Sequence, residues 1–419
     1  MELNFKIKDS LDKHIKIKEK KLIYFKKEGF PNKRLEEWKF TDLEKILNDN
    51  FKELNNKKKL DSKTPKALNL SFKHNSIKLI NGKLTSFDFK VENFKDKKYS
   101  PINDLELDQL LNFVEKTKEN PMQDLNTALH EGGLSLNIKS GYKFKYPIVI
   151  FNYFSGNLKN KMINTSEVIN MSKDSNATII EFLIDDTSGS FFKNTFKYIN
   201  IEEHASLNYF FINKKESKNF FYDFSKIKLS KSSNFKKYIF SSGIKFNKSD
   251  SNIELKGTNS SSEIYSGLFI NKNSHQEIKT NIQHLKSSCQ SHQDIKNVVT
   301  KGGKGVFQGK VFVDQIAQKT NAYQLSKGLL LDEDSEFSTK PELEIYADDV
   351  KCSHGSTSGN IDNDALYYLR SRGIKEKDAI KMIVKGFLKS VLKDIKNKEF
   401  IEVIENHLDT HINYEGRSN

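Results

Sequence analysis

The sequence predicts a mainly β protein with helical regions at both ends. Apolar residues recur at helical spacing near each end of the chain, whereas a long middle section alternates short apolar runs with polar turns. At 419 residues the chain is also long enough to bury a large core. The predicted division is a mostly helical region with a short β-hairpin at 1–133, a β core at 134–360 and a helical domain at 361–419.

The N-terminal region contains two predicted helices joined by an irregular connection. Residues 8–58 place apolar side chains at helical intervals, and residues 30–41 interrupt this pattern. Pro31 and Trp38, the only tryptophan, lie in the interruption, which indicates a fixed connection between the helices. The apolar positions that define the two helices are Ile15, Leu22, Ile23, Phe25, Leu43, Ile46 and Leu47.

A hairpin and two further helices are predicted in the rest of this region. Residues 77–84 have Asn81-Gly82 at their centre, a dipeptide typical of tight β-hairpin turns. Helical spacing then returns at 104–113 and at 121–130. Gly132-Gly133 follow, and we expect them to end the second helix.

The middle of the chain consists of short apolar runs separated by clusters of Asn, Ser, Gly and Asp. Runs such as 147–151, 177–182 and 310–313 predict one strand after another. About 200 residues without a convincing helix favour a β-sandwich, a β-barrel or a β-solenoid. Because no strict repeat is visible, periodicity does not choose among these three architectures.

Helical spacing resumes after Asp362. The first predicted helix, 364–372, ends at Gly373, and the next carries a broad apolar stripe. We expect any uncovered part of the stripe, around Phe387 and Leu388, to bind a partner protein; the alternative is that the stripe packs on neighbouring helices. The stripe consists of Ile380, Ile383, Val384, Phe387, Leu388, Val391, Leu392 and Ile395, and a third helix continues it with Phe400, Val403, Ile404 and Leu408.

Several classes of protein are disfavoured by the composition. The net charge of +14 comes from lysines spread along the chain, with one tight run at Lys57 to Lys59 and no nucleic-acid-binding motif. The longest apolar stretch, 147–154, is too short to cross a bilayer, and the N-terminus has no apolar signal-peptide core. Cys289 and Cys352 cannot form a disulfide framework. We therefore expect a cytoplasmic protein whose partners are neither nucleic acid nor membrane.

The glycine-rich segment 301–311 does not fit a nucleotide-binding loop. A Walker loop would require Gly where the chain has Lys304 and Ser or Thr where it has Val311. ATP hydrolysis is therefore expected to come from another chain. The sequence also lacks the Gly-x-Ser-x-Gly, His-Glu-x-x-His and Cys-x-x-Cys patterns of hydrolases, metalloproteases and thioredoxin-like proteins.

Cys352 and His354 form the candidate ligand pair. Positions i and i+2 of a strand project from one face, so the thiol and the imidazole are expected to point the same way. These ligand types suit zinc and iron–sulfur centres, but two ligands cannot complete a tetrahedral site. The alternative is a half-buried Cys and a hydrogen-bonded His at a strand end. The apolar alternation slips in phase at Asp348-Asp349, which predicts a bulge or a corner beside the pair.

A second group of metal-binding residue types has irregular spacing. It is expected to be structural, because no regular element would bring its members together at these intervals. Its members are His275, His284, Cys289 and His292.

Two long segments near the C-terminus resemble a known family. Residues 337–359 and 365–374 resemble the signature of the SufB/SufD family of iron–sulfur cluster assembly scaffold proteins almost position for position, and 318–324 and 328–331 fit as well. The resemblance implies a right-handed parallel β-helix core with helical regions at both ends. It also implies a SufB–SufD heterodimer joined through the β-helices, with SufC ATPases docked on the C-terminal helices.

Three features resemble the SufD side of the family more than the SufB side. They are the segment 34–41, the helix at 125–128 followed by Gly132-Gly133, and a chain shorter than a usual SufB. The resemblance then implies a non-catalytic scaffold subunit, with ATP hydrolysis by SufC. A SufB-like scaffold that assembles with itself is the alternative within the family.

On this reading His354 and Cys352 face SufB at the interface where a nascent cluster forms, and SufB completes the coordination. We expect no cluster to be held stably by the isolated chain, and a transient one to be shared with SufB. The family has been associated with iron supply and reduced flavin, to which no residues are assigned here. A β-helical carbohydrate enzyme is a rival from another class, but the adjacent Asp348 and Asp349 make a poor catalytic pair.

Overall fold

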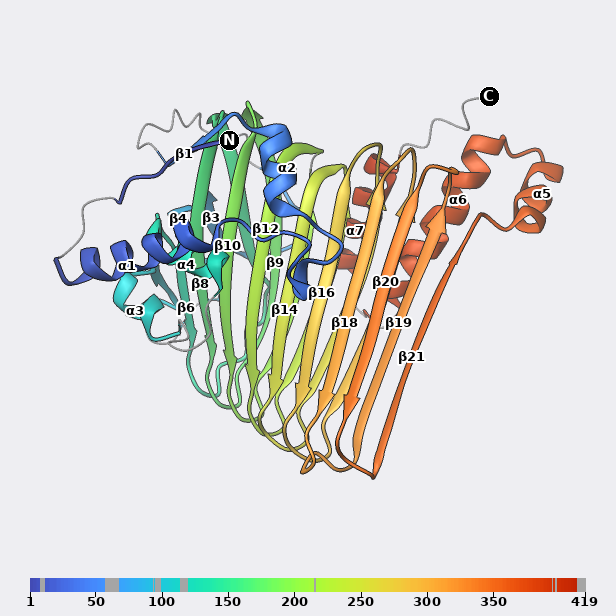
Figure 1. Ribbon diagram of the computed structural model, residues 1–419. Helices are drawn as coiled ribbons and strands as arrows, with labels where there is room; N and C mark the ends of the chain where they lie inside the picture. The colour runs from blue at the N-terminus through green and yellow to red at the C-terminus, as the bar shows by residue number, and fades with distance from the viewer. Residues whose placement is uncertain are drawn as a thin grey trace.

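A computed structural model describes residues 1–7, 12–56, 68–92, 94, 99–113, 120–214, 216–393, 395 and 398–412. The chain is mainly β and forms a long parallel β-helix with helices at its N- and C-terminal ends (Figure 1). The fold class predicted from the sequence is therefore confirmed. The lysine run at 57–59 lies outside the described residues. Within the described part of the chain, no helix is both long and apolar enough to cross a membrane.

The β-helix is built from two sheets that face each other. Within the β-helix, each strand pairs in parallel with the strand two places along the chain, so successive strands alternate between an 11-stranded sheet, sheet A, and a 10-stranded sheet, sheet B. In sheet A the turns are formed by β8 (Lys161–Met171), β10 (Phe191–Ile201), β12 (Ser217–Leu229), β14 (Ile244–Leu255), β16 (His275–His284), β18 (Lys304–Val313) and β20 (Glu336–Ile345). In sheet B they are formed by β7 (Ile148–Asn157), β9 (Asn176–Ser188), β11 (Ser206–Asn213), β13 (Asn234–Ser242), β15 (Ser261–Ile270), β17 (Gln290–Val299), β19 (Thr320–Leu330) and β21 (Val350–Gly359).

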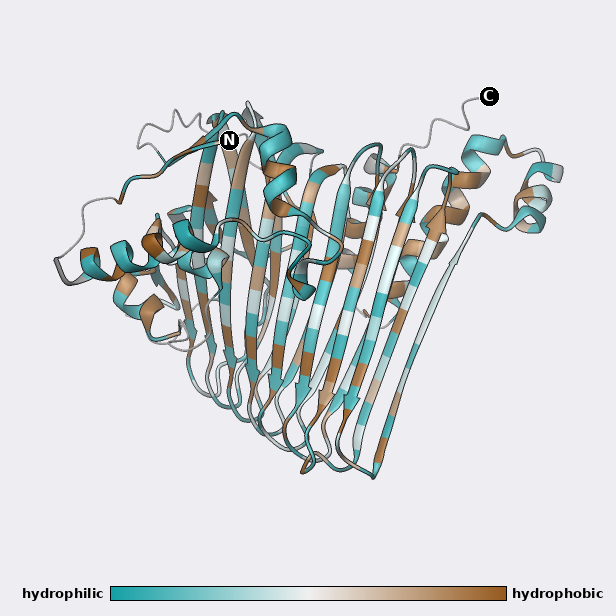
Figure 2. Cartoon of the chain, viewed as in Figure 1, coloured by the Kyte–Doolittle hydropathy of each residue, from teal (hydrophilic) through white to brown (hydrophobic). Residues whose placement is uncertain are grey.

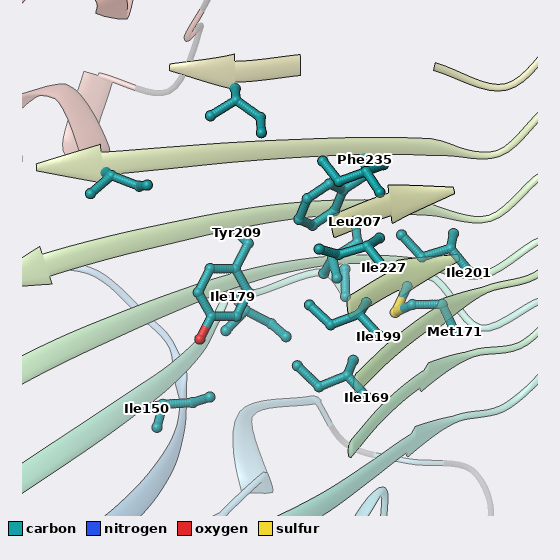
Figure 3. Packing of buried hydrophobic residues seen from close by; sticks show 14 of the residues in the cluster. Ile150, Ile169, Met171, Ile179, Ile199, Ile201, Leu207, Tyr209, Ile227 and Phe235 are labelled. Atoms are coloured by element: carbon teal, nitrogen blue, oxygen red, sulfur yellow. The ribbon is translucent and has the colours of Figure 1, made fainter. Parts of the chain in front are cut away.

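Alternate side chains point into the lumen between the sheets and stack in columns along the β-helix axis. Ile169, Ile199 and Ile227 form one such column, since they are register partners on neighbouring strands of sheet A (Figure 3). The alternation along each strand is visible as bands of hydropathy (Figure 2). Columns of this kind hold the largest apolar cluster of the chain.

The corners between strands explain why no strict repeat is visible. At one corner, six successive turns each contain a non-glycine residue with a positive φ, a conformation that Asn and Asp adopt more readily than most residues. The interval from Ile201 to Leu229 nevertheless differs from that between Leu229 and Leu255, although all three stack in one column. The repeat therefore lies in the three-dimensional register and not in a fixed sequence period. The positive-φ residues are Asp174, His204, Ser232, Asn259, Ser288 and Lys319.

The N-terminal region covers the outer face of sheet A. Both predicted helices are present, and the connection between them, 30–41, lies along the outer face of sheet A; we call it the N-terminal strap. Trp38 in the strap packs on Tyr222 of β12, with ring centroids 5.3 Å apart. The elements are β1 (Glu2–Asn4), α1 (Asp12–Glu28), η1 (Glu36–Trp38), α2 (Leu43–Asn50) and β2 (Glu53–Asn55).

The predicted hairpin is also present, because Asn81 and Gly82 both adopt positive φ between β3 (Asn75–Ile80) and β4 (Lys83–Asp88). The two following helices are shorter than predicted. Gly133 does not end a helix but begins a strand, where a Cβ atom would lie 1.7 Å from the carbonyl oxygen of Ser166. The remaining elements are η2 (Lys90–Glu92), β5 (Ile102–Asp104), α3 (Leu107–Leu111), α4 (Pro121–Ala128) and β6 (Gly133–Ile138).

Three predicted helices at the C-terminus are found as α5 (Asn363–Ser371), α6 (Glu376–Lys389) and α7 (Lys398–His411), with the 3-10 turn η3 (Ser390–Leu392) after α6. The apolar stripe of α6 packs against the outer face of sheet B as well as against α7. The stripe therefore covers sheet B in addition to a neighbouring helix. By contrast, α5 contains no buried residue.

Candidate functional site

The β-helix ends in two strands that each have one unpaired edge. Among the described residues, β20 pairs with β18 alone and β21 with β19 alone, so both stand at the end of their sheets. An unpaired strand edge presents backbone N–H and C=O groups to a partner strand. We call this the open end of the β-helix.

Cys352 and His354 both lie on β21 at the open end. Their register partners on β19 are Ala322 and Gln324, which are buried in the lumen. The two side chains therefore continue the inward-facing columns, which agrees with their spacing in the sequence. His354 is exposed because it lies on the last strand of sheet B, whereas Cys352 is half-buried.

The surroundings of Cys352 are apolar. Its side chain packs against a small cluster of Val311, Val313, Ala317, Ala322 and Ala347. Burial raises the pKa of its thiol, and a hydrogen bond with the Ala322 backbone offsets only part of this effect. The thiol is therefore protonated at neutral pH, and a metal would have to displace its proton.

The corner before β21 explains the phase slip in the sequence. Residues 346–349 connect β20 to β21, so the slip at Asp348-Asp349 marks the change from one sheet to the other. Two hydrogen bonds fix the corner: the Lys319 amide donates to the Asp349 carbonyl at 2.6 Å, and the Asp349 amide donates to Gln318 Oε1 at 2.9 Å. Both aspartates are exposed, in separate positions of a turn.

The second group of candidate ligands is not brought together. His275 and His284 lie at opposite ends of β16. Cys289 is buried and contacts the Gly257 carbonyl at 3.2 Å, whereas the ring of His292 stacks on Tyr323 with centroids 5.3 Å apart. In the described part of the chain, no group of three or more His, Cys, Asp or Glu side chains could hold a metal ion. Cys352 and His354 are thus at most half of a coordination set.

The glycine-rich segment 301–311 forms a turn followed by β18. Lys301 and Gly302 have positive φ in the turn, and the following residues are part of the strand. A phosphate loop would instead lead from a strand into a helix. This segment therefore has neither the sequence nor the structure of a nucleotide site.

The two residues of the C-terminal helices that were predicted to bind a partner, Phe387 and Leu388, differ in their exposure. Leu388 is fully buried against sheet B, and Phe387 is half-buried with the Lys296 ammonium 5.5 Å from its ring centroid. Leu388 is therefore not available to a partner. The exposed apolar side chains of this region are Tyr367, Tyr368 and Met382, which are 75%, 57% and 51% exposed.

Sequence reasoning missed the polar side chains inside the lumen. Lys197 and Glu181, whose charged groups are 2.5 Å apart, are both buried between the sheets. Gln324, the register partner of His354, is fully buried, and neither of its amide atoms has a hydrogen-bond partner among the described residues. These side chains could have been found only from the columns of inward-facing residues. The columns can be assigned only when the register between strands is known, and the sequence alone does not give this register.

Comparison with known proteins identifies the family. Residues 154–387, more than half of the chain, match the model of the SufBD core domain of the SUF system of FeS cluster assembly. The chain is similar to the iron–sulfur cluster assembly protein SufD of Escherichia coli (strain K12), with 26% identity over 387 residues, 88% of this chain and 86% of that protein. An iron–sulfur cluster assembly SufBD family protein of Synechocystis is 45% identical over 100 residues, 24% of this chain and 22% of that protein. The chain therefore belongs to the SufBD family of the SUF iron–sulfur cluster assembly system.

Proposed function

We propose that the chain is a SufD-type scaffold that pairs with SufB through the open end of its β-helix, docks the SufC ATPase on its C-terminal helices and contributes to a nascent cluster at the SufB interface. The observation that carries this proposal is the position of Cys352 and His354 on the inner face of a terminal strand. Two ligands at an unpaired strand edge can form a complete coordination site if a second subunit supplies the remaining ligands.

The two terminal strands differ in a way that supports pairing through β21. Edge strands that must not associate are usually guarded by charges or proline. Strand β20 has both, with Pro341 and four charged side chains, Glu336, Lys340, Glu342 and Glu344. Strand β21 has one charged residue, Lys351, followed by small or neutral residues up to Gly359. We infer that β21 is the edge that accepts the partner strand.

The iron–sulfur cluster is cargo in this scheme and not a resident cofactor. His354 offers an imidazole ring, whose unprotonated nitrogen can bind iron directly through its lone pair. The Cys352 thiol must first lose its proton, and its apolar surroundings oppose the charged form. His354 is therefore the main contributor from this chain, with Cys352 as a second ligand once the partner closes the site.

The SufC docking surface is assigned to α5 and the exposed side of α6. Tyr367 and Met382 are large, apolar and more than half exposed, and α5 has no buried residue of its own. Leu366 of α5 packs partly against the apolar cluster beneath the C-terminal helices, so the face of α5 left for a partner is the one that carries Tyr367. The ATPase is the occupant that we assign to this surface.

Two alternatives predict different complexes. A SufB-like scaffold would assemble with itself through the same edge, and a β-helical carbohydrate enzyme would turn over acidic polysaccharides without SUF partners.

The test is co-expression of the tagged chain with SufB and SufC, followed by purification and measurement of the stoichiometry of the complex. The proposal predicts a complex that contains all three proteins. Recovery of a homodimer alone in the presence of both partners would favour self-assembly and overturn the proposal.

A further inference from the structure

The outer face of sheet B contains a cavity of about 380 Å³ that lies away from the open end of the β-helix. Its floor is formed by β9, β11 and β13, which are interior strands of the sheet. Residues 144–147, which lead into β7, form one wall, and Ile395 and Phe400 of the C-terminal region form the other. We call this cavity the sheet B pocket. Three parts of the chain that are far apart in the sequence therefore enclose one site.

The floor of the sheet B pocket has a polar side and an aromatic side. Thr178, Asn208 and Lys236 are register partners on the three neighbouring strands and form a polar row. Beside this row, Phe210 and Tyr238 are also register partners, and their rings stack with centroids 4.6 Å apart and an angle of 6° between the planes. A ligand on this floor can therefore make hydrogen bonds along one side and ring contacts along the other.

Contacts within the chain hold both walls of the pocket in place. The Glu92 carboxylate accepts hydrogen bonds from the Tyr146 backbone amide at 2.9 Å and from the Tyr142 hydroxyl at 3.0 Å, which fixes the first wall. On the second wall, the ring of Phe400 packs edge-on against Phe210, with centroids 5.9 Å apart. The folded chain thus forms the pocket by itself, and a ligand does not have to organise it.

The charge of the pocket favours an anion. Among the described residues that line it, Lys145 and Lys236 are charged and none is acidic. Lys236 forms an ion pair with Glu263 at 2.9 Å, and Glu263 is not one of the lining residues. Lys145 is exposed, and its ammonium lies 5.3 Å from the ring centroid of Tyr146. Lys145 is therefore the cation best placed to contact a ligand.

We propose that the sheet B pocket binds a small planar aromatic molecule that carries an anionic group. Its ring lies against the aromatic side of the pocket, and its anionic group contacts Lys145. The Thr178 hydroxyl and the Asn208 amide, which are both partly exposed, form hydrogen bonds with polar atoms of the ligand. A lipid tail does not fit this lining, because an acyl chain would cover the hydroxyl and the amide without offering them hydrogen bonds.

The size of the pocket agrees with a small ligand. Small-molecule sites in proteins have volumes of roughly 300–1,000 Å³, and the sheet B pocket is near the lower limit. Both an aromatic carboxylate and an aromatic phosphate meet the chemical requirements. The two classes share the ring and the negative charge, and a direct comparison of one member of each class distinguishes them.

Calorimetric titration of the full-length chain tests the proposal. The probes are 1-naphthoate, an aromatic carboxylate, and adenosine 5′-monophosphate, an aromatic phosphate. At least one of them should bind saturably with a dissociation constant below about 1 mM, and the tighter probe identifies the anionic group. Naphthalene-1-methanol keeps the rings without the charge, whereas acetate and inorganic phosphate keep the charge without a ring. Each of these three controls should bind at least about tenfold more weakly.

Two variants, each with a matched control, assign the binding to the pocket. Lys145→Glu should raise the dissociation constant about tenfold, since it replaces a charge-assisted contact by repulsion. Lys143→Glu is its control, because Lys143 is an exposed lysine of the same segment that does not line the pocket. Asn208→Trp should abolish binding by filling the pocket from its floor. Its control is Ser206→Trp, two residues earlier on β11 and outside the lining.

Several results would overturn the proposal. One is a lack of saturable binding of both aromatic anions to the wild type. Another is equal affinity of Lys145→Glu and Lys143→Glu for the bound probe, and a third is wild-type affinity in Asn208→Trp. Naphthalene-1-methanol or a ring-free anion that binds as tightly as the aromatic anion would also contradict it. The titration uses neither SufB nor SufC, so its failure would leave the scaffold proposal intact.

Discussion

The Thr41 hydroxyl lies 2.8 Å from Nε2 of His275, although 234 positions separate the two residues. Thr41 has one hydroxyl proton and donates it to the carboxylate of Glu277, so the His275 ring must donate its Nε2 proton to Thr41. Lys248 and Gln308 also donate to this carboxylate. The last residue of the N-terminal strap thus completes the hydrogen bonding of a buried carboxylate on sheet A.

Replacing Thr41 by Val should therefore destabilise the chain by about 1–3 kcal/mol, because Glu277 and His275 both lose a buried hydrogen-bond partner. Denaturant unfolding measures this difference. Thr85→Val is the matched control, since the exposed Thr85 hydroxyl donates to a hairpin carbonyl. Equal free energies of unfolding for the two variants would contradict the role assigned to Thr41.

Acid should destabilise the chain through His284. Burial lowers the pKa of His284 from 6.5 to about 4, so below pH 6.5 the unfolded state binds a proton that the folded state does not. The free energy of unfolding should therefore fall by about 1.4 kcal/mol per pH unit from this group as the pH drops from 6.5 towards 4.

The measurement is the pH dependence of denaturant unfolding in His284→Asn, which should show a shallower slope than the wild type. The control is His204→Asn, an exposed residue with a positive φ that Asn also tolerates. If the slope of His284→Asn matches that of the wild type, the buried neutral imidazole is not responsible for acid sensitivity.

Substitution of His354 by Ala should separate function from stability. The side chain is exposed, so the free energy of unfolding should change by less than about 0.5 kcal/mol. Pairing with SufB should persist, whereas iron and sulfide incorporation by the assembled complex should collapse. Cys352→Ser should reduce incorporation less. Cluster formation at the wild-type rate and yield in His354→Ala complexes would refute the site assignment.

A negative charge on the exposed helices should weaken the complex with SufC. Tyr367→Glu and Met382→Glu place a carboxylate on the proposed docking surface and should each raise the dissociation constant about tenfold or more. Ile23→Glu makes the same kind of change at an apolar residue of α1 that is 69% exposed. Calorimetry with purified SufC should show weaker binding by the two surface variants than by Ile23→Glu. Unchanged affinity in both surface variants would exclude this docking site.

The isolated chain should not hydrolyse ATP. Lys304 and Val311 stand where a phosphate loop requires Gly and a hydroxyl residue, and the segment forms a strand. Phosphate release by the purified chain, measured beside a mock purification, tests this expectation. Metal-dependent turnover that exceeds the mock preparation would show a nucleotide site elsewhere.

Elements with strong local signals could be predicted from the sequence. Asn81-Gly82 specifies its hairpin because both residues accept a positive φ. The helices were likewise visible from apolar spacing, but Gly133 was misread as a helix end. Its role depends on the backbone of Ser166, a contact that no local pattern contains.

The sequence predicts the candidate site only in part, because some of its features also depend on contacts between residues far apart in the chain. Two-residue spacing was sufficient to place Cys352 and His354 on one face of a strand, and the phase slip located the corner beside them. The buried position of Gln324 in register with His354 could not be recognised, because strands joined by turns of variable length leave no fixed sequence interval between the two residues. The sequence does not distinguish Leu388 from its neighbours in the apolar stripe, because its burial depends on its contact with sheet B.

The packing of the strap makes Trp38 a spectroscopic reporter. This residue is the only tryptophan, is 6% exposed, and has the Lys248 ammonium 4.7 Å from its ring centroid. Its fluorescence therefore reports one event, the separation of residues 30–41 from sheet A, while circular dichroism follows the strands. Unfolding curves from the two signals would reveal whether the strap leaves before the β-helix melts, without any label being added to the chain.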